Sequence, residues 1–229
     1  MEIGMKSVKE LISKDLRDRY RSQWGTIRLT VKTTYGKLKR QIIRPSFPKL
    51  ENGELYLHLG CGRINHEKFV NIDGLPAPHI HYIREIDNLC PFKNNSVDLI
   101  YGSHCLEHFS HRKVSNVLSE WHRVLKTGGI LRLSVPDFDV LCEIYKESGN
   151  EIDSILEILM ARQDYKYNFH MTAFNQSSLT RLLSNVGFRE IRNWQPGACE
   201  LTQFKDFSTH KVQVNQTFYP ISLNLEAIK

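Results

Sequence analysis

Short apolar runs that alternate with helix-patterned segments are the feature that most constrains this fold. The runs are residues 55–59, 68–73, 81–87, 96–103, 129–136, 188–194 and 220–229. The later runs are separated by segments with helical periodicity, residues 111–125, 138–148, 151–163 and 177–188. Strands that alternate with helices form a mostly parallel sheet with helices on both faces. We therefore predict an α/β protein with a Rossmann-like, seven-stranded sheet.

The distribution of charge divides the chain into an extension and a body. Residues 1–50 contain 13 basic and 4 acidic residues, a net charge of +9, whereas residues 51–229 contain 18 and 21, a net charge of −3. Apolar residues at helical spacing predict an amphipathic helix over residues 6–23. Two prolines and a glycine make residues 44–53 typical of a linker. We expect a basic, helical extension over residues 1–50 and one folded domain over residues 51–229.

The positive charge of the extension favours an acidic partner. Nucleic acid, anionic lipid and a phosphorylated glycan carrier are all acidic, and a basic amphipathic helix can lie on a membrane surface. No stretch resembles a nucleic-acid-binding module, so we expect an anionic membrane surface rather than nucleic acid. The alternative is that the extension packs across the body as a solvated helix.

The cysteines suggest a reducing compartment, and the hydropathy of the chain suggests neither a membrane span nor a signal peptide. The five cysteines include no C-x-x-C pair, and an odd number argues against both a disulfide framework and a zinc site, so we expect free thiols. No apolar run approaches the length of a membrane span, and the first residues lack the apolar core of a signal peptide. We expect a cytoplasmic protein, peripheral at the membrane if the extension binds lipid.

The residues that follow the predicted strands indicate a nucleoside-containing cofactor. Ligands of such sheets bind beyond the carboxyl ends of the strands. Gly60 and Gly62 follow the first run, and Asp73 ends the second. Glycines let the backbone approach a ligand closely, and an acid at the second strand commonly accepts hydrogen bonds from ribose hydroxyls. The alternative is two turn glycines and a surface aspartate.

The spacing of these residues argues against a dinucleotide. A dinucleotide site has a third glycine and an acid about 20 residues later, because pyrophosphate binds at a helix N-terminus. Here no third glycine follows Gly62, and Asp73 comes only eleven residues after it. A cofactor without phosphates fits better, and S-adenosylmethionine is the obvious one.

The chain resembles the class I S-adenosylmethionine-dependent methyltransferases. It is most similar to the subgroup whose relatives often accompany glycosyltransferases in polysaccharide biosynthesis. The matching stretches, in order, are LHLGCG, FVNIDG, IDNLCPFKNNSVDLIYGSHCLEHF, EWHRVLKTGGILRLSVPDFDVL, FHMTAF, LTRLLSNVGF and SLNLEAIK. The resemblance implies an antiparallel last strand and a hydroxyl acceptor on a saccharide or glycolipid. The alternatives are a methyltransferase of a small molecule or of RNA, and a non-catalytic cofactor-binding or assembly protein.

The resemblance also assigns cofactor-binding residues. They are Gly60, Cys61, Gly62, Asp73, Asp87, Leu89 and Ser103. The two glycines would leave room for the methionine part, Asp73 would take both ribose hydroxyls, and Asp87 would accept from the adenine amino group. Leu89 would pack on the adenine ring and Ser103 would lie beside the sulfonium. The alternative for Asp87 is a turn or helix-cap aspartate.

Two features depart from the pattern of this family. His58 occupies the position of the usual acid before the first glycine. The crossover between the first two strands, residues 60–68, is shorter than the usual dozen residues. We therefore expect an abbreviated first crossover helix.

Three residues are candidates for catalysis, and no metal site is predicted. His104 follows the fourth run and could remove a proton from a hydroxyl acceptor, with Glu107 orienting its ring. Asp137 and His170 are further candidates, although His170 could instead make only local hydrogen bonds. His104 and His108 have the i, i+4 spacing of a zinc site, but no third ligand is evident, and Glu107 and His108 could equally be structural.

Overall fold

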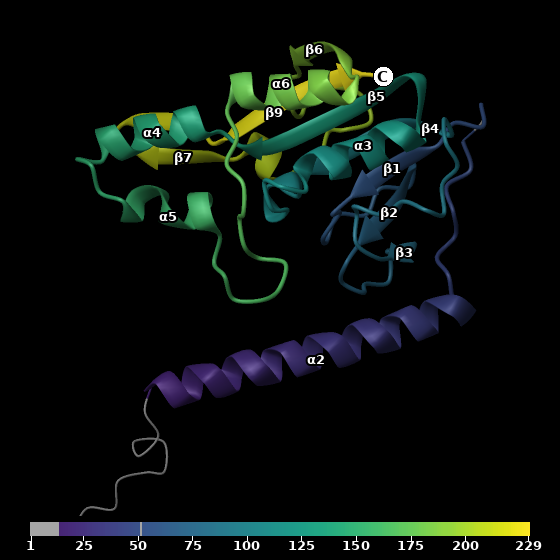
Figure 1. Ribbon diagram of the computed structural model, residues 1–229, viewed down its shortest axis with the longest axis horizontal. Helices are drawn as coiled ribbons and strands as arrows, with labels where there is room; N and C mark the ends of the chain where they lie inside the picture. Colours follow the sequence, from purple (N-terminus) through teal and green to yellow (C-terminus); the bar gives the residue numbers. More distant parts are fainter. Residues whose placement is uncertain (1–13, 51) are drawn as a thin grey trace, which may run out of the picture.

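The computed structural model describes residues 14–50 and 52–229, without the side chains of residues 14–26. Seven strands form one sheet in the order β3-β2-β1-β4-β5-β9-β6 (Figure 1). The strands are β1 (Tyr56–Leu59), β2 (Phe69–Asp73), β3 (Tyr82–Ile83), β4 (Val97–Ser103), β5 (Leu125–Pro136), β6 (Arg189–Asn193) and β9 (Ser222–Ile228). Strands β1 to β5 pair in parallel, and β9 is antiparallel to both β5 and β6. This confirms the predicted mostly parallel, seven-stranded sheet with an antiparallel last strand.

The helices of the domain follow the predicted segments. They are α3 (Val114–Val124), α4 (Phe138–Glu147), α5 (Asp153–Met160) and α6 (Gln176–Val186), with short 3-10 helices η1 (Leu106–His108) and η2 (Phe207–Thr209). Asn175 caps the N-terminus of α6 in a capping box, and Gly187 ends it in a left-handed conformation. No helix lies between β1 and β2, where residues 60–68 fold as turns, because nine residues are too few for a parallel crossover with a helix.

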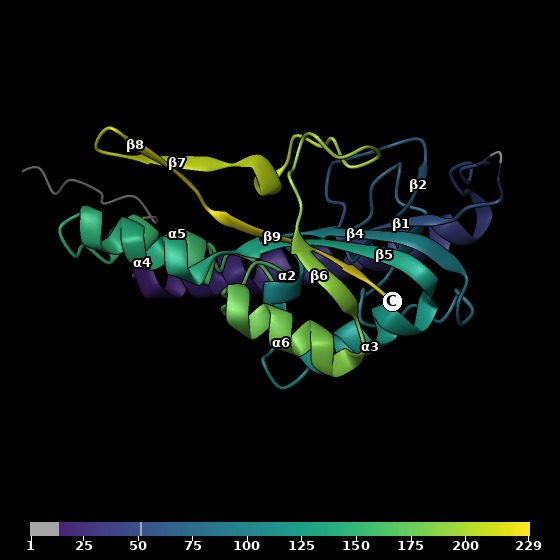
Figure 2. The same ribbon diagram turned by 90° about the horizontal axis from the view of Figure 1, so that it is seen from above.

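The two faces of the sheet are covered differently. Helices α3 and α6 pack side by side on one face, over the largest apolar cluster (Figure 2). Trp121 is fully buried in that cluster, and its indole N–H donates to the carbonyl of Ile86 at 2.8 Å. The other face is covered by the segment after β6, which brings Trp194 and Phe204 onto aromatic residues of β1, β2 and β4. A loop therefore takes the place that the prediction of helices on both faces assigned to helices.

A hairpin was not foreseen in the C-terminal part. Strands β7 (Lys211–Val214) and β8 (Thr217–Pro220) pair antiparallel as a separate two-stranded sheet. Asn215 turns the chain with a φ of 55°, a left-handed conformation that asparagine tolerates well. The alternating runs on either side of Asn215 were the sequence feature that could have predicted it.

The basic extension is one long helix, α2 (Lys14–Ile42). The predicted helix over residues 6–23 lies partly outside the described residues, and the observed helix continues far beyond its predicted end. Figure 1 shows α2 beside the domain, and its C-terminal part packs on β3 and the loop after β2. Arg40 donates to the carbonyl of Ala77 at 2.7 Å, and a side-chain carbon at Gly36 would come within 2.5 Å of Pro76. None of the described helices combines the length and apolar character needed to cross a membrane.

Candidate active site

The structure brings the two glycines and Asp73 together at the carboxyl edge of the sheet. The backbone N–H of Gly62 donates to one carboxylate oxygen of Asp73 at 2.9 Å, and that of Leu75 donates to the other at 2.7 Å. Gly60 and Gly62 have φ values of 62° and 55°, in the region that favours glycine. The carboxylate is therefore held in place by backbone donors and keeps lone pairs for further hydrogen bonds.

The two glycines have different surroundings. A side-chain carbon added at Gly60 would lie 2.8 Å from Cβ of Cys105, so only glycine fits there. A side-chain carbon added at Gly62 would meet no atom within 4 Å, so space is open on that side of the backbone. Together with the carboxylate of Asp73, this arrangement suits a nucleoside cofactor.

The other predicted cofactor residues differ in how accessible they are. Asp87 is partly buried, four residues beyond the end of β3. Ser103 ends β4, and its hydroxyl is buried without a hydrogen-bond partner among the described residues. Cys61 is buried, and burial raises the pKa of its thiol, so it contributes backbone to the site but no reactive side chain. All five cysteines are free, as expected.

Leu89 requires a correction. Its side chain is fully buried in the main apolar cluster, and its backbone N–H donates to Glu120 at 2.6 Å. A side chain with no exposed surface cannot pack on an adenine ring in this arrangement. The apolar run around Leu89 could not distinguish a residue of the core from a residue of the cleft.

Tyr167, which was not predicted as a cofactor ligand, lies beside the predicted cofactor residues. Tyr167 comes from the long segment between α5 and α6, and its ring lies against Gly74, where a side-chain carbon would come within 2.8 Å. The Tyr167 hydroxyl donates to Glu85 at 2.8 Å, and Lys166 also contacts Glu85 at 3.0 Å. The segment therefore covers the backbone next to Asp73. The aromatic run YKYNF, residues 165–169, gives by itself no indication of where this segment lies.

His58 does not take over the role of the acid that the resembling family usually has at this position. Its ring is buried on the face of the sheet that the segment after β6 covers. There it stacks on Phe204 at a centroid distance of 5.0 Å with an interplanar angle of 12°. Burial lowers the pKa of His58 to about 3, so the ring stays neutral at neutral pH. We therefore assign His58 to the core.

His104 has protein partners at both ring nitrogens. Nε2 lies 2.7 Å from the hydroxyl of Ser222, which itself donates to the carbonyl of Phe207 at 2.7 Å. Nδ1 lies 3.3 Å from a carboxylate oxygen of Glu107. His104 has a φ of 49°, an uncommon backbone conformation that is often found at functional sites. The predicted pair of His104 and Glu107 therefore exists in the structure.

His170 joins the same cluster from a distant segment. Its Nε2 lies 3.8 Å from the Glu107 carboxylate, and its ring is 4.9 Å from that of His108. Burial lowers the pKa of His170. Burial acts to raise the pKa of Glu107, but the neighbouring histidines, His104 first, outweigh burial and lower it. The sequence did not show that these residues meet.

The hydrogen bond of Asp137 does not involve the cluster of His104, Glu107 and His170. Asp137 caps α4, accepting from the backbone N–H of Asp139 at 3.1 Å. Burial raises the pKa of Asp137 above its usual value. The residue follows β5 at the same edge of the sheet, so it remains a candidate for contact with an acceptor.

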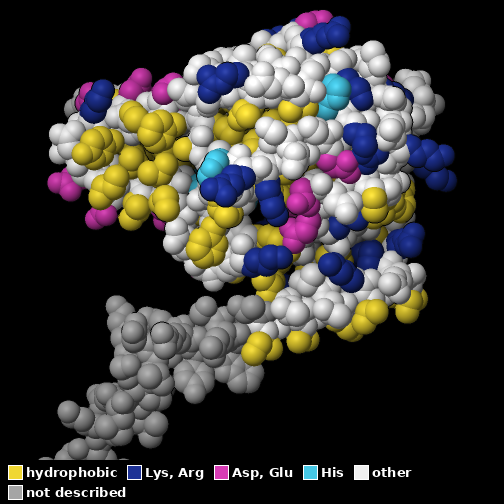
Figure 3. All heavy atoms as spheres, viewed as in Figure 1, with side chains coloured by type: hydrophobic (Ala, Val, Ile, Leu, Met, Phe, Trp, Pro, Cys, Tyr) yellow, Lys and Arg dark blue, Asp and Glu magenta, His cyan; other side chains and the backbone are white. Residues whose placement is uncertain are grey.

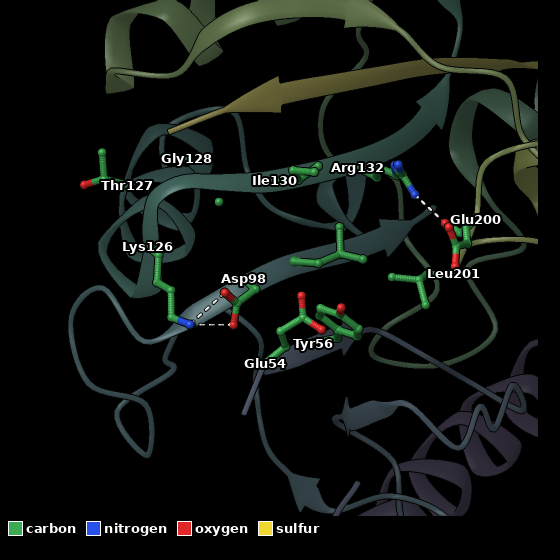
Figure 4. Close-up of a pocket in the computed structure, with 12 residues that line it drawn as sticks. Glu54, Tyr56, Asp98, Lys126, Thr127, Gly128, Ile130, Arg132, Glu200 and Leu201 are labelled. Atoms are coloured by element: carbon green, nitrogen blue, oxygen red, sulfur yellow. Dashed lines mark hydrogen bonds and ion pairs between the residues drawn. The ribbon is translucent and has the colours of Figure 1, made fainter. Parts of the chain in front are cut away.

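A pocket lies at the opposite edge of the sheet (Figure 4). This pocket of about 360 Å³ is lined by residues at the amino ends of β1, β4 and β5. Among the residues that line it, Lys126 pairs with Asp98 at 2.7 Å, and Arg132 donates to the carbonyl of Glu200 at 2.7 Å. Because ligands of parallel sheets bind at the carboxyl ends of the strands, this pocket is not the cofactor site.

The chain is similar to known methyltransferases over part of its length. The family model described as a methyltransferase domain matches residues 68–133. The ubiquinone/menaquinone biosynthesis C-methyltransferase UbiE of Blochmanniella floridana is 24% identical over 150 residues, which cover 62% of this chain and 56% of that protein. The chain thus spans little more than half the length of this curated relative.

Solved structures of low identity resemble the chain. A SAM-dependent methyltransferase from Archaeoglobus fulgidus has a TM-score of 0.49 and 17% identity, with 84% of this chain and 91% of that chain covered. The 1,6-didemethyltoxoflavin-N1-methyltransferase of Burkholderia thailandensis, solved with S-adenosylhomocysteine, has a TM-score of 0.46 and 14% identity, with 100% and 93% covered.

The family match lies on the part of the sheet that carries several of the predicted cofactor residues. The match covers the chain from the start of β2 into β5, which includes Asp73 and the edge after β4. Over this part of the sheet the chain is therefore similar to a methyltransferase domain.

Proposed function

We propose that this protein binds S-adenosylmethionine and transfers its methyl group to a small acceptor molecule. The observation that carries the proposal is the Gly62–Asp73 hydrogen bond at the carboxyl edge of the sheet, beside open space over Gly62. Each oxygen of Asp73 accepts one backbone N–H and can accept a ribose hydroxyl as well. The cofactor supplies a methyl group on positive sulfur, and the chain supplies binding and alignment.

We further propose that the acceptor is a hydroxyl group of a saccharide or glycolipid intermediate. His104 supports this, because transfer to a hydroxyl benefits from a base. Phe207 lies 5.2 Å from the His104 ring and is 58% exposed, so it offers an aromatic face beside the proposed base. The runner-up is another small molecule, which the likeness to a quinone-pathway C-methyltransferase favours.

Calorimetric titration with S-adenosylmethionine and S-adenosylhomocysteine tests the first step. We expect saturable binding of both and a higher unfolding temperature in their presence, because a ligand that binds only the folded state stabilises it. If millimolar ligand neither binds nor raises the unfolding temperature, the proposal is wrong. Tight binding of NADH instead would restore the dinucleotide alternative.

A screen with labelled cofactor tests the acceptor. Nucleotide sugars, short oligosaccharides, small aromatic compounds and RNA are incubated separately with the full chain. Label in a saccharide supports the proposed acceptor, whereas label only in an aromatic compound or in RNA refutes the saccharide and leaves methyl transfer intact. Cofactor binding without transfer to any of these compounds would favour a non-catalytic role.

We propose in addition that α2 attaches the protein to an anionic membrane surface. Five apolar residues of α2 form what we call the outer stripe. They are Ile27, Val31, Tyr35, Leu38 and Ile42, between 52% and 86% exposed. Their spacing of three and four residues places them on one helical face, and Figure 3 shows apolar side chains along the edge of α2 that points away from the domain.

The opposite face of α2 explains why the outer stripe stays exposed. Leu29, Thr33, Gly36 and Arg40 are partly buried and recur at the same helical spacing, on the side that packs on the domain. The helix thus has one face for the domain and one without a partner among the described residues. An exposed apolar helical face is typical of an interaction site.

Charge favours lipid over a second copy of this helix. Residues 27–44 contain six basic residues and no acidic one. Two such helices would repel each other, whereas the anionic lipids of a cytoplasmic leaflet attract juxtamembrane basic residues. An amphipathic basic helix therefore fits a negatively charged membrane surface.

Serine substitutions in the outer stripe should weaken membrane binding. We expect the triple variant Val31→Ser, Tyr35→Ser, Leu38→Ser to bind phosphatidylserine-containing vesicles at least ~10-fold more weakly, since burial of each large apolar side chain contributes up to ~1.5–3 kcal/mol. The variant Thr34→Ser, Gln41→Ser is the matched control and should bind like the wild type. Vesicle flotation or co-sedimentation at low and moderate salt gives the affinities.

Two results would contradict the membrane proposal. One is equal vesicle binding by the wild type and the triple variant. The other is a wild-type dimer in sedimentation that the triple variant loses, which would show that a second copy covers the stripe.

A further inference from the structure

A buried carboxylate without hydrogen bonds lies next to the proposed methyl-transfer site. The Glu107 side chain is 1% exposed, and neither of its oxygens has a hydrogen-bond partner among the described residues. It belongs to η1, directly after the loop that follows β4. Burial of an ionised carboxylate is costly unless it is paired or coordinates a metal. The groups nearest to it are two histidine rings, with His104 Nδ1 at 3.3 Å and His170 Nε2 at 3.8 Å.

Two histidines next to this carboxylate have the same arrangement of ring nitrogens. Nδ1 of His108 lies 3.0 Å from the carbonyl of Phe169, and Nδ1 of His170 lies 2.8 Å from the carbonyl of Ile158. A carbonyl oxygen only accepts, so Nδ1 carries the proton in both rings. In the neutral rings, Nε2 then keeps its lone pair. Metal-binding histidines typically donate their other N–H to a carbonyl in this way.

We propose that Glu107, His108 and His170 bind a divalent transition metal ion, with zinc the favoured ion. One ligand atom from each residue lies within 4.8 Å of the other two. Two imidazoles and one carboxylate form a donor set that suits zinc and ferrous iron. Three protein ligands leave the fourth coordination position open to water.

Metal binding requires a contraction of this cluster, whose ligand atoms lie up to 4.8 Å apart. Zinc–ligand bonds are about 2.0–2.2 Å long, which places ligand atoms roughly 3.3–3.6 Å apart in a tetrahedron. The His170 Nε2 is 3.8 Å from the Glu107 carboxylate, so a shift of a few tenths of an ångström suffices for that pair. The backbone already holds the two segments together, because Met171 donates to the carbonyl of Glu107 at 2.8 Å.

We expect metal binding to keep the cofactor site covered by the segment between α5 and α6. His170 lies on the segment between α5 and α6 that also carries Tyr167, whose ring packs against Gly74 beside Asp73. A metal ion shared between this segment and η1 would hold the cover in place. The sequence showed only the His104 and His108 pair, because its third ligand comes from more than sixty residues away.

The rival interpretation is that His104 alone balances the charge of Glu107. Its Nδ1 lies 3.3 Å from the carboxylate, and a ring protonated at both nitrogens would form an ion pair there. In that case the cluster needs no metal, and removal of His108 or His170 would leave metal binding unchanged.

Titration of the full chain with metal distinguishes the two interpretations without an activity assay. Chain treated with a chelator and then dialysed is titrated with Co²⁺, whose visible absorption reports its ligands, and with Zn²⁺ in competition. We expect one equivalent to bind and zinc to raise the unfolding temperature. His170→Ala and His108→Ala should each lower the affinity by at least ~100-fold, more than loss of an outer-shell partner.

The control is His111→Ala, an exposed histidine three residues beyond His108, which should bind metal like the wild type. Glu107→Gln retains the shape of the side chain and removes the charge, and it should also weaken binding. Circular dichroism shows which variants fold, and His108→Ala serves if His170→Ala does not. Absence of saturable binding, or equal affinity in the wild type and a folded histidine variant, would overturn the metal site and leave the methyltransferase proposal unaffected.

Discussion

Replacement of His104 with alanine is expected to lower the rate of methyl transfer by ~10²–10⁴-fold, the usual contribution of a general base. His104 follows β4 at the carboxyl edge, and Glu107 lies 3.3 Å from its Nδ1. Ser222 donates its only proton to the carbonyl of Phe207, so Nε2 donates to Ser222 in this arrangement. To act as the base, His104 must carry its proton on Nδ1, toward Glu107, and present an unprotonated Nε2 to an acceptor hydroxyl that replaces Ser222. Hydrogen bonds of catalytic groups often form only in the complex with substrate.

Single-turnover rates with a saccharide acceptor give the measurement, and the affinity for cofactor should stay nearly unchanged. His111→Ala is the control, since this histidine is exposed and lies away from β4. A loss of rate of less than about tenfold would show that alignment of the acceptor with the cofactor accounts for nearly all of the rate enhancement. His104 would then only shape the pocket. Restoration of most of the rate by His104→Gln would support the same conclusion, because glutamine cannot act as the base.

Replacement of Asp73 with alanine should weaken the binding of S-adenosylmethionine by roughly 1.5–3 kcal/mol, or about 10- to 150-fold, the usual range for hydrogen bonds to a charged group. The carboxylate is also held by the backbone N–H groups of Gly62 and Leu75, so part of the loss comes from a rearranged glycine turn. Calorimetry gives the affinity, and thermal unfolding shows whether the domain remains folded.

Asp73→Asn separates the two contributions. Asparagine keeps one oxygen that can accept a backbone N–H, but it removes the charge and one of the two acceptors. We expect an intermediate affinity for Asn and the lowest for Ala. An unchanged dissociation constant in the alanine variant would show that the cofactor does not contact the end of β2.

Local pattern was enough to predict the sheet and one edge of the site. Apolar runs and helical periodicity reflect which faces of each element are buried, and these are properties of neighbouring residues. The parallel arrangement then places the residue after each strand at one edge, which is why Gly60, Gly62 and Asp73 could be grouped from the sequence. The length of the crossover after β1 likewise predicted that no full helix fits there.

Contacts between distant segments were decided only by the tertiary structure. The approach of His170 to Glu107 and of Ser222 to His104 joins residues separated by 63 and 118 positions, and no local periodicity records such distances. Leu89 illustrates the same limit, because an apolar residue looks alike in a core and in a cleft. Burial depends on which elements pack together in three dimensions, and the packing of α3 and α6 on the sheet put Leu89 in the core.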